Sequence, residues 1–199
     1  MQPLFARNTL QLSVWVASVL IWRVMEEGVG IWSRKRLRAG AQRQDKGSYI
    51  ILLCLIGIGS ALGVYLAFQV PATAITSASV LIFWFGIALI YAGIGLRLYA
   101  IITLGSFFTT TVAIAAEQTV VAAGPYRLIR HPSYTGALIT LLGIGLSLTN
   151  YLSLLVIMAC ALIGFSYRIH VEEQVLQAHL GQRYLDYMRH TKRLIPFVL

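Results

Sequence analysis

Five long apolar stretches dominate the chain and decide what it can fold into. A helix needs about 20 mainly apolar residues to cross the hydrocarbon core of a bilayer. Here 58% of the 199 residues are hydrophobic and only 12% are charged. The pattern predicts an all-α, polytopic integral membrane protein with about five transmembrane helices. The fourth stretch is the shortest, so four spans with one re-entrant hairpin are the alternative. The stretches cover residues 9–25, 49–70, 79–102, 134–149 and 151–169.

Basic residues are concentrated in one loop, and this predicts the orientation. Short cytoplasmic loops carry an excess of Lys and Arg, and residues 32–48 contain six basic residues and one acidic residue. With this loop in the cytoplasm, the N-terminus and the uncharged connectors 71–78 and 149–151 lie outside, and the C-terminus lies in the cytoplasm. The net charge of +9 fits attraction to anionic membrane lipids. No basic stripe with interleaved aromatic residues indicates nucleic-acid binding.

The polar residues divide the chain into two parts. Residues 1–102 are predicted to form a transmembrane scaffold of three spans. Residues 103–199 are predicted to form the catalytic region, which contains a cytoplasmic connector at 103–130, a helical hairpin and a C-terminal amphipathic helix. This last helix covers 171–190, is interrupted by Gly181 and is expected to close over a site.

Small residues and cysteines inside the spans have structural interpretations. Glycines such as the Gly59 and Gly63 pair favour close helix packing in lipid. Cys54 and Cys160 lie inside apolar spans, and neither they nor the four histidines have metal-ligand spacing, so no metal site is predicted.

The stretch GPYRLIRHPSYTG, residues 124–136, places polar side chains directly before the fourth span. Pro132 biases His131 away from helical backbone angles. His131 is therefore expected at a helix entrance, where backbone N–H groups and the helix dipole favour an anion. Ser133 is a candidate cap of this entrance.

The second polar motif, RIHVEE, stands at the inner end of the fifth span. Arg168 and Glu172 are four residues apart and share a helix face, whereas Glu173 is rotated from Glu172 by about 100°. Ionisable groups at membrane depth are usually paired or functional, so the motif indicates either a structural Arg168–Glu172 ion pair or a binding site. A zwitterionic amino acid fits such a site, with its carboxylate toward His131 and its ammonium toward Glu172.

Three motifs, in this order and spacing, resemble the isoprenylcysteine carboxyl methyltransferase family and, more distantly, phospholipid N-methyltransferases. They are LGSFFTTTV, QTVVAAGPYRLIRHPSYTG and RIHVEEQVLQAHLGQRYLDYMRHTKRLIPF, and the resemblance covers residues 104–199. It implies S-adenosyl-L-methionine as cofactor and methyl donor, bound on the cytoplasmic side. At position 118 the eukaryotic enzymes tend to have histidine, so Gln118 offers an amide instead. The residues that the resemblance assigns to the cofactor site are Gln118, Thr119, Val120, Val121, Tyr126, His131, Pro132, Ser133, Tyr134 and Glu172.

The resemblance also implies catalytic roles for Arg168, which would face the acceptor, and for Glu172. A carboxylate acceptor is ionised near neutral pH and needs positioning rather than a general base. The expected enzyme is thus a carboxyl O-methyltransferase acting on a lipophilic small-molecule or lipidated acceptor, such as an isoprenylcysteine. One alternative is a lipid amine N-methyltransferase, in which Glu172 or Glu173 would be the base. The other is an NADPH-dependent enzyme similar to sterol reductases, which share the RHP turn. A protein of another class, an anion transporter, is disfavoured because the first four spans have almost no polar residues near mid-bilayer.

Overall fold

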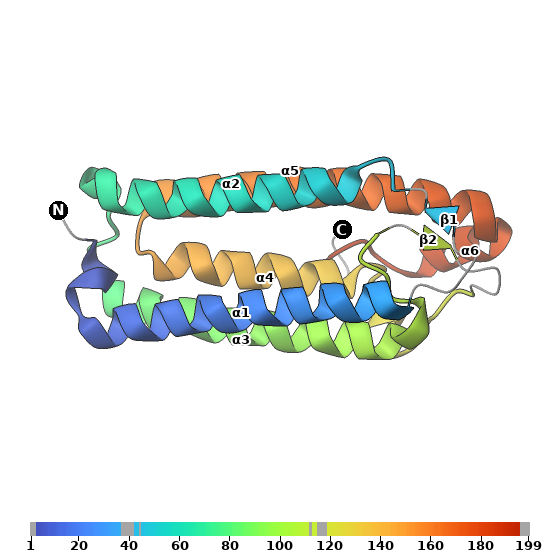
Figure 1. Cartoon of the computed structure of the whole chain (residues 1–199), viewed down its shortest axis with the longest axis horizontal. Coiled ribbons are helices and arrows are strands. Elements are labelled where there is room, and N and C mark those ends of the chain that lie inside the picture. Colours follow the sequence, from blue (N-terminus) through green and yellow to red (C-terminus); the bar gives the residue numbers. More distant parts are fainter. Residues whose placement is uncertain (1–2, 37–41, 44, 112, 115–118, 196–199) are drawn as a thin grey trace.

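Five long helices lie side by side along one axis in the computed structural model of the chain (Figure 1), which describes residues 3–36, 42–43, 45–111, 113–114 and 119–195. Two strands of two residues each pair in antiparallel fashion, with Gln42 opposite Ile114 and Arg43 opposite Ala113. The predicted all-α class is confirmed. The elements, with η for a short 3-10 helix, are η1 (Leu4–Arg7), α1 (Thr9–Arg36), β1 (Gln42–Arg43), α2 (Ser48–Gln69), η2 (Pro71–Thr73), α3 (Ser79–Leu104), η3 (Gly105–Phe107), β2 (Ala113–Ile114), η4 (Gly124–Arg127), α4 (Pro132–Ser147), α5 (Tyr151–Leu180) and α6 (Gln182–His190).

The five long helices coincide with the five predicted apolar stretches. Within the described part of the chain, α2, α3 with its extension to Phe107, and α5 are long and apolar enough to cross a membrane. The chain is therefore a multi-pass membrane protein. Helix α4 has 16 residues, or about 24 Å at a rise of about 1.5 Å per residue, against about 30 Å for the hydrocarbon core. It is shorter than the core, as expected from the shortest predicted span.

Two helices are longer than the apolar stretches that predicted them. Helix α1 continues past residue 25 because Glu and Arg are good helix formers, and Arg23 Nη2 lies 3.3 Å from Glu27 Oε1 one turn later. Helix α5 continues past residue 169 and ends at Gly181, whose φ of +55° is one that glycine adopts at low cost. The predicted amphipathic segment is thus the end of α5 followed by α6.

Close contacts between glycines hold the helices in two antiparallel pairs, α3 with α4 and α2 with α5. A Cβ atom at Gly86 would lie 2.7 Å from the carbonyl oxygen of Gly143, so these two backbones touch directly. On the other pair, a Cβ at Gly59 would lie 2.7 Å from Cys160 Cβ, and one at Gly63 would lie 2.7 Å from Ile157. The predicted role of these glycines in helix packing is confirmed.

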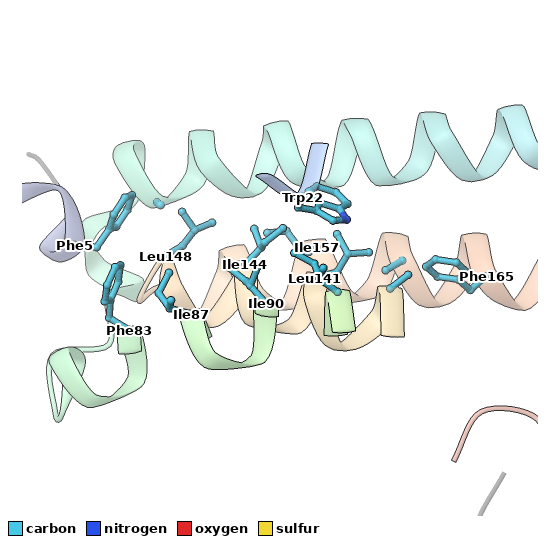
Figure 2. Close-up of a cluster of buried hydrophobic side chains, with 14 of the residues drawn as sticks. Phe5, Trp22, Phe83, Ile87, Ile90, Leu141, Ile144, Leu148, Ile157 and Phe165 are labelled. Atoms are coloured by element: carbon cyan, nitrogen blue, oxygen red, sulfur yellow. The ribbon is translucent and has the colours of Figure 1, made fainter. Parts of the chain in front are cut away.

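One apolar cluster fills the space between the helix pairs (Figure 2) and includes side chains from all five long helices. Trp22 of α1 lies against the cluster between the two pairs, near Leu141 and Ile157 in Figure 2. Helix α1 is thereby tied to both pairs, although its closest helix neighbour is α3. The labelled members are Phe5, Trp22, Phe83, Ile87, Ile90, Leu141, Ile144, Leu148, Ile157 and Phe165.

The end of the bundle that carries η1 and the short connectors 70–78 and 148–150 is here called the turn end (Figure 1). Asn150 links its segments: Nδ2 donates to the carbonyl of Val70 at 3.1 Å, and Oδ1 accepts from Thr73 Oγ1 at 3.1 Å. The same Oδ1 caps α5 by accepting from the Ser153 backbone N–H at 3.0 Å. One buried neutral side chain therefore joins both connectors.

The opposite end, here called the loop end, carries α6 and the described parts of two connectors, residues 42–43, 45–47, 105–111, 113–114 and 119–131. After α6 the chain returns and lies beside residues 128–131. The backbone N–H of Arg130 donates to Lys192 O at 2.7 Å, that of Lys192 to Leu128 O at 3.1 Å, and that of His131 to Arg193 O at 3.0 Å. This pairing fixes the entrance of α4.

Candidate active site

The hydroxyl of Tyr134 stands at the centre of a polar network at the loop end. It donates to Glu172 Oε2 at 2.6 Å and accepts from Arg168 Nε at 3.2 Å. Tyr134 lies in the first turn of α4, and the other two residues lie one turn apart on α5. Arg168 and Glu172 share a face as predicted, and Tyr134 bridges them, so the structure shows a three-residue network where a direct ion pair was one of the two alternatives.

Arg168 is a buried guanidinium whose side chain is only 2% exposed. Its Nη1 forms an ion pair with Asp45 and donates to Ser48 Oγ at 2.6 Å, and its Nη2 donates to the Thr110 carbonyl at 2.8 Å. A buried charge is tolerated only where it is paired and hydrogen-bonded. Arg168 thereby joins α5 to the start of α2 and to the connector after α3.

A second charged cluster surrounds Glu173, the residue that follows Glu172 on α5. Arg130 Nε lies 2.9 Å from Glu173 Oε1, and Arg193 Nη2 lies 3.0 Å from Oε2. His131 Nε2 lies 3.3 Å from Oε1, so the tautomer protonated on Nε2 donates to the carboxylate. Arg130 also donates to the carbonyl oxygens of Met188 and Thr191. The cluster therefore holds the RHP turn against the end of the described chain.

His131 and Glu172, which the zwitterion hypothesis assigns to the two ends of one ligand, lie side by side in the structure. His131 Nδ1 lies 3.9 Å from Glu172 Oε2, and the His131 ring stacks on the Tyr134 ring with centroids 5.5 Å apart. The predicted free helix entrance is only partly present, because the His131 backbone N–H is already bonded to Arg193 O.

Two adjoining pockets at the loop end contain most of the predicted site. The first is lined by Ser133, Tyr134 and Arg168, and the second by Thr119, Val120 and Val121. Seven residues line both pockets and make them one continuous cleft. These shared residues are Leu104, Phe107, Tyr126, Arg130, His131, Glu172 and Leu176.

Two phenols of the second pocket stay protonated near neutral pH. Burial, followed by the charge of Glu172, raises the pKa of Tyr126 well above its usual range. Burial raises the pKa of Tyr187 to about 12, although the charge of Arg130 opposes the shift. Tyr187 accordingly donates to the Tyr126 carbonyl at 2.7 Å, and this bond fixes α6 beside η4.

The remaining predicted site residues have mixed outcomes. Pro132 is buried as the first residue of α4, where a missing N–H costs nothing. Gln118 lies outside the described residues. The prediction that Ser133 caps α4 is wrong: its side chain makes no capping bond and instead accepts from Arg97 Nη1 at 3.0 Å. Among the described residues, no three His, Cys, Asp or Glu side chains are grouped to hold a metal ion.

Sequence reasoning missed the Arg97–Glu26 ion pair, which joins α3 to α1. Arg97 Nη2 lies 2.7 Å from Glu26 Oε2, and Arg97 Nη1 also donates to the Ser133 carbonyl at 3.1 Å. Both charges stand at the ends of apolar stretches, and this placement is the signal that could have paired them.

These two residues line a third cavity, of about 190 Å³, between the helix pairs. It borders the first pocket, because Tyr49, Leu52 and Tyr134 line both. A cavity with a charged rim and an apolar interior therefore leads from the bundle to the Tyr134 network.

Within the described residues, three helices are long and apolar enough to cross a membrane, and a cleft lined by charged side chains lies at one end of the bundle; together these features define the class of multi-pass membrane proteins. Residues 84–178 match the isoprenylcysteine carboxyl methyltransferase (ICMT) family. The predicted resemblance to this family is thus confirmed over these residues.

Similar proteins include two plant enzymes and one eukaryotic enzyme of known structure. Protein-S-isoprenylcysteine O-methyltransferases B and A of Arabidopsis thaliana are 36% and 38% identical over 116 residues, which are 57% of this chain. The chain spans 59% of the length of each plant relative. The solved structure of the eukaryotic intramembrane Ras methyltransferase ICMT is similar with a TM-score of 0.60 and 29% identity, over 73% of this chain and 52% of that one.

Proposed function

We propose that this protein is an integral membrane methyltransferase that uses S-adenosyl-L-methionine to methylate the carboxylate of a lipophilic acceptor. The observation that carries the proposal is the Tyr134 network, which joins Arg168 and Glu172 in a cleft built from the family's own motifs. The similarity to enzymes named for isoprenylcysteine supports an isoprenylcysteine-like acceptor, which is either a small molecule or part of a lipidated protein. In this proposal residues 1–102 act as scaffold and residues 103–199 carry the reaction.

The cleft offers the groups that the cofactor needs. The Glu172 side chain is 28% exposed and lines both loop-end pockets, so its carboxylate is available to the ammonium of the methionine part. Val120, Val121 and Leu176 give the second pocket an apolar wall suited to an adenine ring. When bound, S-adenosyl-L-methionine supplies an activated methyl group, because its positively charged sulfonium becomes a neutral thioether when the methyl group is transferred.

The protein's contribution to the reaction is chiefly positioning. An ionised carboxylate acceptor needs no general base, so in-line alignment with the donor is the main requirement. Tyr134 lines both the first pocket and the cavity between the helix pairs, so an acceptor chain in that cavity would bring its carboxylate to the Tyr134 hydroxyl. Arg168 would orient that carboxylate through a charge-assisted bond, after exchange with its present partner Asp45.

The proposal includes the orientation in the membrane. The loop end, with the basic segment 32–48, would face the cytoplasm, the N-terminus would lie outside, and the C-terminus would be cytoplasmic. The soluble cofactor would then arrive from the cytoplasm and the acceptor sideways from the membrane lipids.

Calorimetric titration of the detergent-purified protein with S-adenosylhomocysteine tests the proposal, with NADPH titrated in parallel. We expect saturable binding of S-adenosylhomocysteine and none of NADPH; the reverse result would support the reductase alternative. Glu172→Gln should weaken S-adenosylhomocysteine binding about 10- to 100-fold, as expected for loss of a hydrogen bond to a charged group.

Arg168→Lys separates the acceptor role from the cofactor role. It should lower kcat with N-acetyl-S-farnesylcysteine by about 10- to 100-fold while leaving S-adenosylhomocysteine affinity close to wild type. If the two variants have equal and small effects on both quantities, Arg168 and Glu172 are structural and the proposed roles are wrong.

A further inference from the structure

Beside the apolar side chains of the cavity between the helix pairs lies a polar atom to which the described part of the chain offers no hydrogen-bond partner. Trp22 of α1 lines this cavity with Leu141 and Phe165. Its side chain is buried, with 6% of the residue exposed, and the indole Nε1 has no hydrogen-bond partner among the described residues. Buried tryptophan N–H groups usually have a partner, because an unpaired donor in an apolar environment costs free energy.

Three other polar side chains of the cavity are paired. Arg97 and Glu26 hold each other at 2.7 Å, and Tyr134 is bonded to Arg168 and Glu172. In Figure 2 the indole of Trp22 lies over Leu141 and Ile157, and its nitrogen is on the edge nearer Phe165. A phenylalanine would fill the same position without a donor, so the indole adds a directional group beside the apolar side chains of Leu141 and Phe165.

We propose that Trp22 selects the acceptor: its indole N–H donates to an oxygen atom within the acceptor's chain, so the site prefers lipophilic carboxylic acids that carry a ketone, ester or ether oxygen over plain hydrocarbon chains. This inference rests on the proposed methyltransferase function. The cavity borders the Tyr134 network, so an acid with its carboxylate at that network extends its chain toward Trp22. The oxygen must stand at one distance from the carboxylate, because the donor is fixed in the core.

The test compares hexadecanoic acid with a series of its mono-keto derivatives, in which the ketone moves along the chain. Methyl transfer from radiolabelled S-adenosyl-L-methionine is measured as base-labile methyl ester, and kcat/KM is determined for each acid. One ketone position should raise kcat/KM about tenfold over hexadecanoic acid, the equivalent of about 1.4 kcal/mol. Trp22→Phe should abolish this preference while the variant still binds S-adenosylhomocysteine, which shows that it is folded.

Trp15→Phe is the matched control. Trp15 is also an indole of α1 whose Nε1 has no partner among the described residues, but it does not line the cavity. The Trp15→Phe variant should keep the positional preference of the wild type.

Three results would overturn the inference: a wild-type protein that shows no preferred ketone position, a preference that survives Trp22→Phe, or one that Trp15→Phe removes equally. A second readout needs no turnover. In protein labelled with ¹⁵N-tryptophan, the preferred keto acid should shift the Trp22 indole proton resonance downfield, and hexadecanoic acid should not; absence of this difference counts against the inference. Failure of the proposed function looks different, since no acid is then methylated and S-adenosylhomocysteine does not bind.

Discussion

At the turn end a neutral asparagine joins the connecting segments, whereas at the loop end buried charges do so. Asn150 reaches three partners within a few residues of the helix ends, at 3.0 to 3.1 Å. Glu173 instead gathers two arginines and a histidine from segments on both sides of α4 and α5. The neutral bonds need little compensation when buried, but each charge at the loop end depends on its partners.

This difference indicates a division of tasks. The turn end links the connectors between neighbouring helices through neutral bonds, and the loop end contains a cleft lined by charged side chains, which we propose receives a charged ligand. The comparison predicts that substitutions at the turn end lower stability without changing ligand affinity.

The largest expected effect is at the loop end, for Glu173→Gln. The side chains of Arg130 and Glu173 are 7% and 4% exposed, and removing one charge of a buried pair costs about 3–5 kcal/mol. The free energy of unfolding should fall by about 3 kcal/mol, which lowers the Tm in detergent by about 10 °C for a chain of this size. Differential scanning fluorimetry of the detergent-purified protein measures this change in Tm.

Arg193→Ala is the control for that prediction. It removes a partner of the same carboxylate whose side chain is 56% exposed, and exposed ion pairs contribute less than about 1 kcal/mol. Equal losses from the two variants would mean that the Glu173 cluster behaves as a surface feature, and the proposed contrast between the ends would be lost.

A smaller effect is expected for Gly93→Ala, in the contact between α3 and α4. The new Cβ would lie 2.5 Å from the Gly136 carbonyl oxygen, so the two backbones must separate, at a cost of about 2 kcal/mol. Gly95→Ala, two residues away, meets no atom within 4 Å and should be neutral or slightly stabilising. Thermal unfolding of the two variants measures how much of the stability depends on the contact between α3 and α4. Similar Tm values for Gly93→Ala and Gly95→Ala would contradict the close contact at Gly93.

The smallest effect is expected at the turn end, for Asn150→Ala. Loss of the cap and of the bond to Val70 O should cost about 1 kcal/mol of unfolding free energy. Asn150→Asp keeps an acceptor for the Ser153 N–H but replaces the donor to Val70 O by a buried carboxylate, so it should lose at least as much. S-adenosylhomocysteine affinity, measured by calorimetry, should be unchanged in both; a clear loss of affinity would show that the two ends are coupled.

Much of the fold follows from the sequence because membrane spans have a required length. The apolar stretches predicted the five long helices, but not that α1 and α5 extend past residues 25 and 169. Charged residues such as Glu27 end an apolar stretch without ending a helix. The division into a scaffold, residues 1–102, and a catalytic region, residues 103–199, stays a prediction.

The site was predictable to the extent that it is local. The four-residue spacing put Arg168 and Glu172 on one face, and the RHP turn put His131 at a helix entrance. The bridge by Tyr134 and the ion pair with Asp45 depend on how α4 and α2 lie against α5, and no spacing along the chain encodes that. Ser133 was misassigned for the same reason, since its partner Arg97 belongs to α3.

The pairing of residues 191–195 with the RHP turn has a consequence for biosynthesis. These residues follow all six helices in the chain, so the ribosome makes them after every membrane-crossing segment has been completed. The backbone bonds to Arg130 and His131 therefore form last. The loop-end cleft therefore acquires its final shape only after all the long helices have been synthesised.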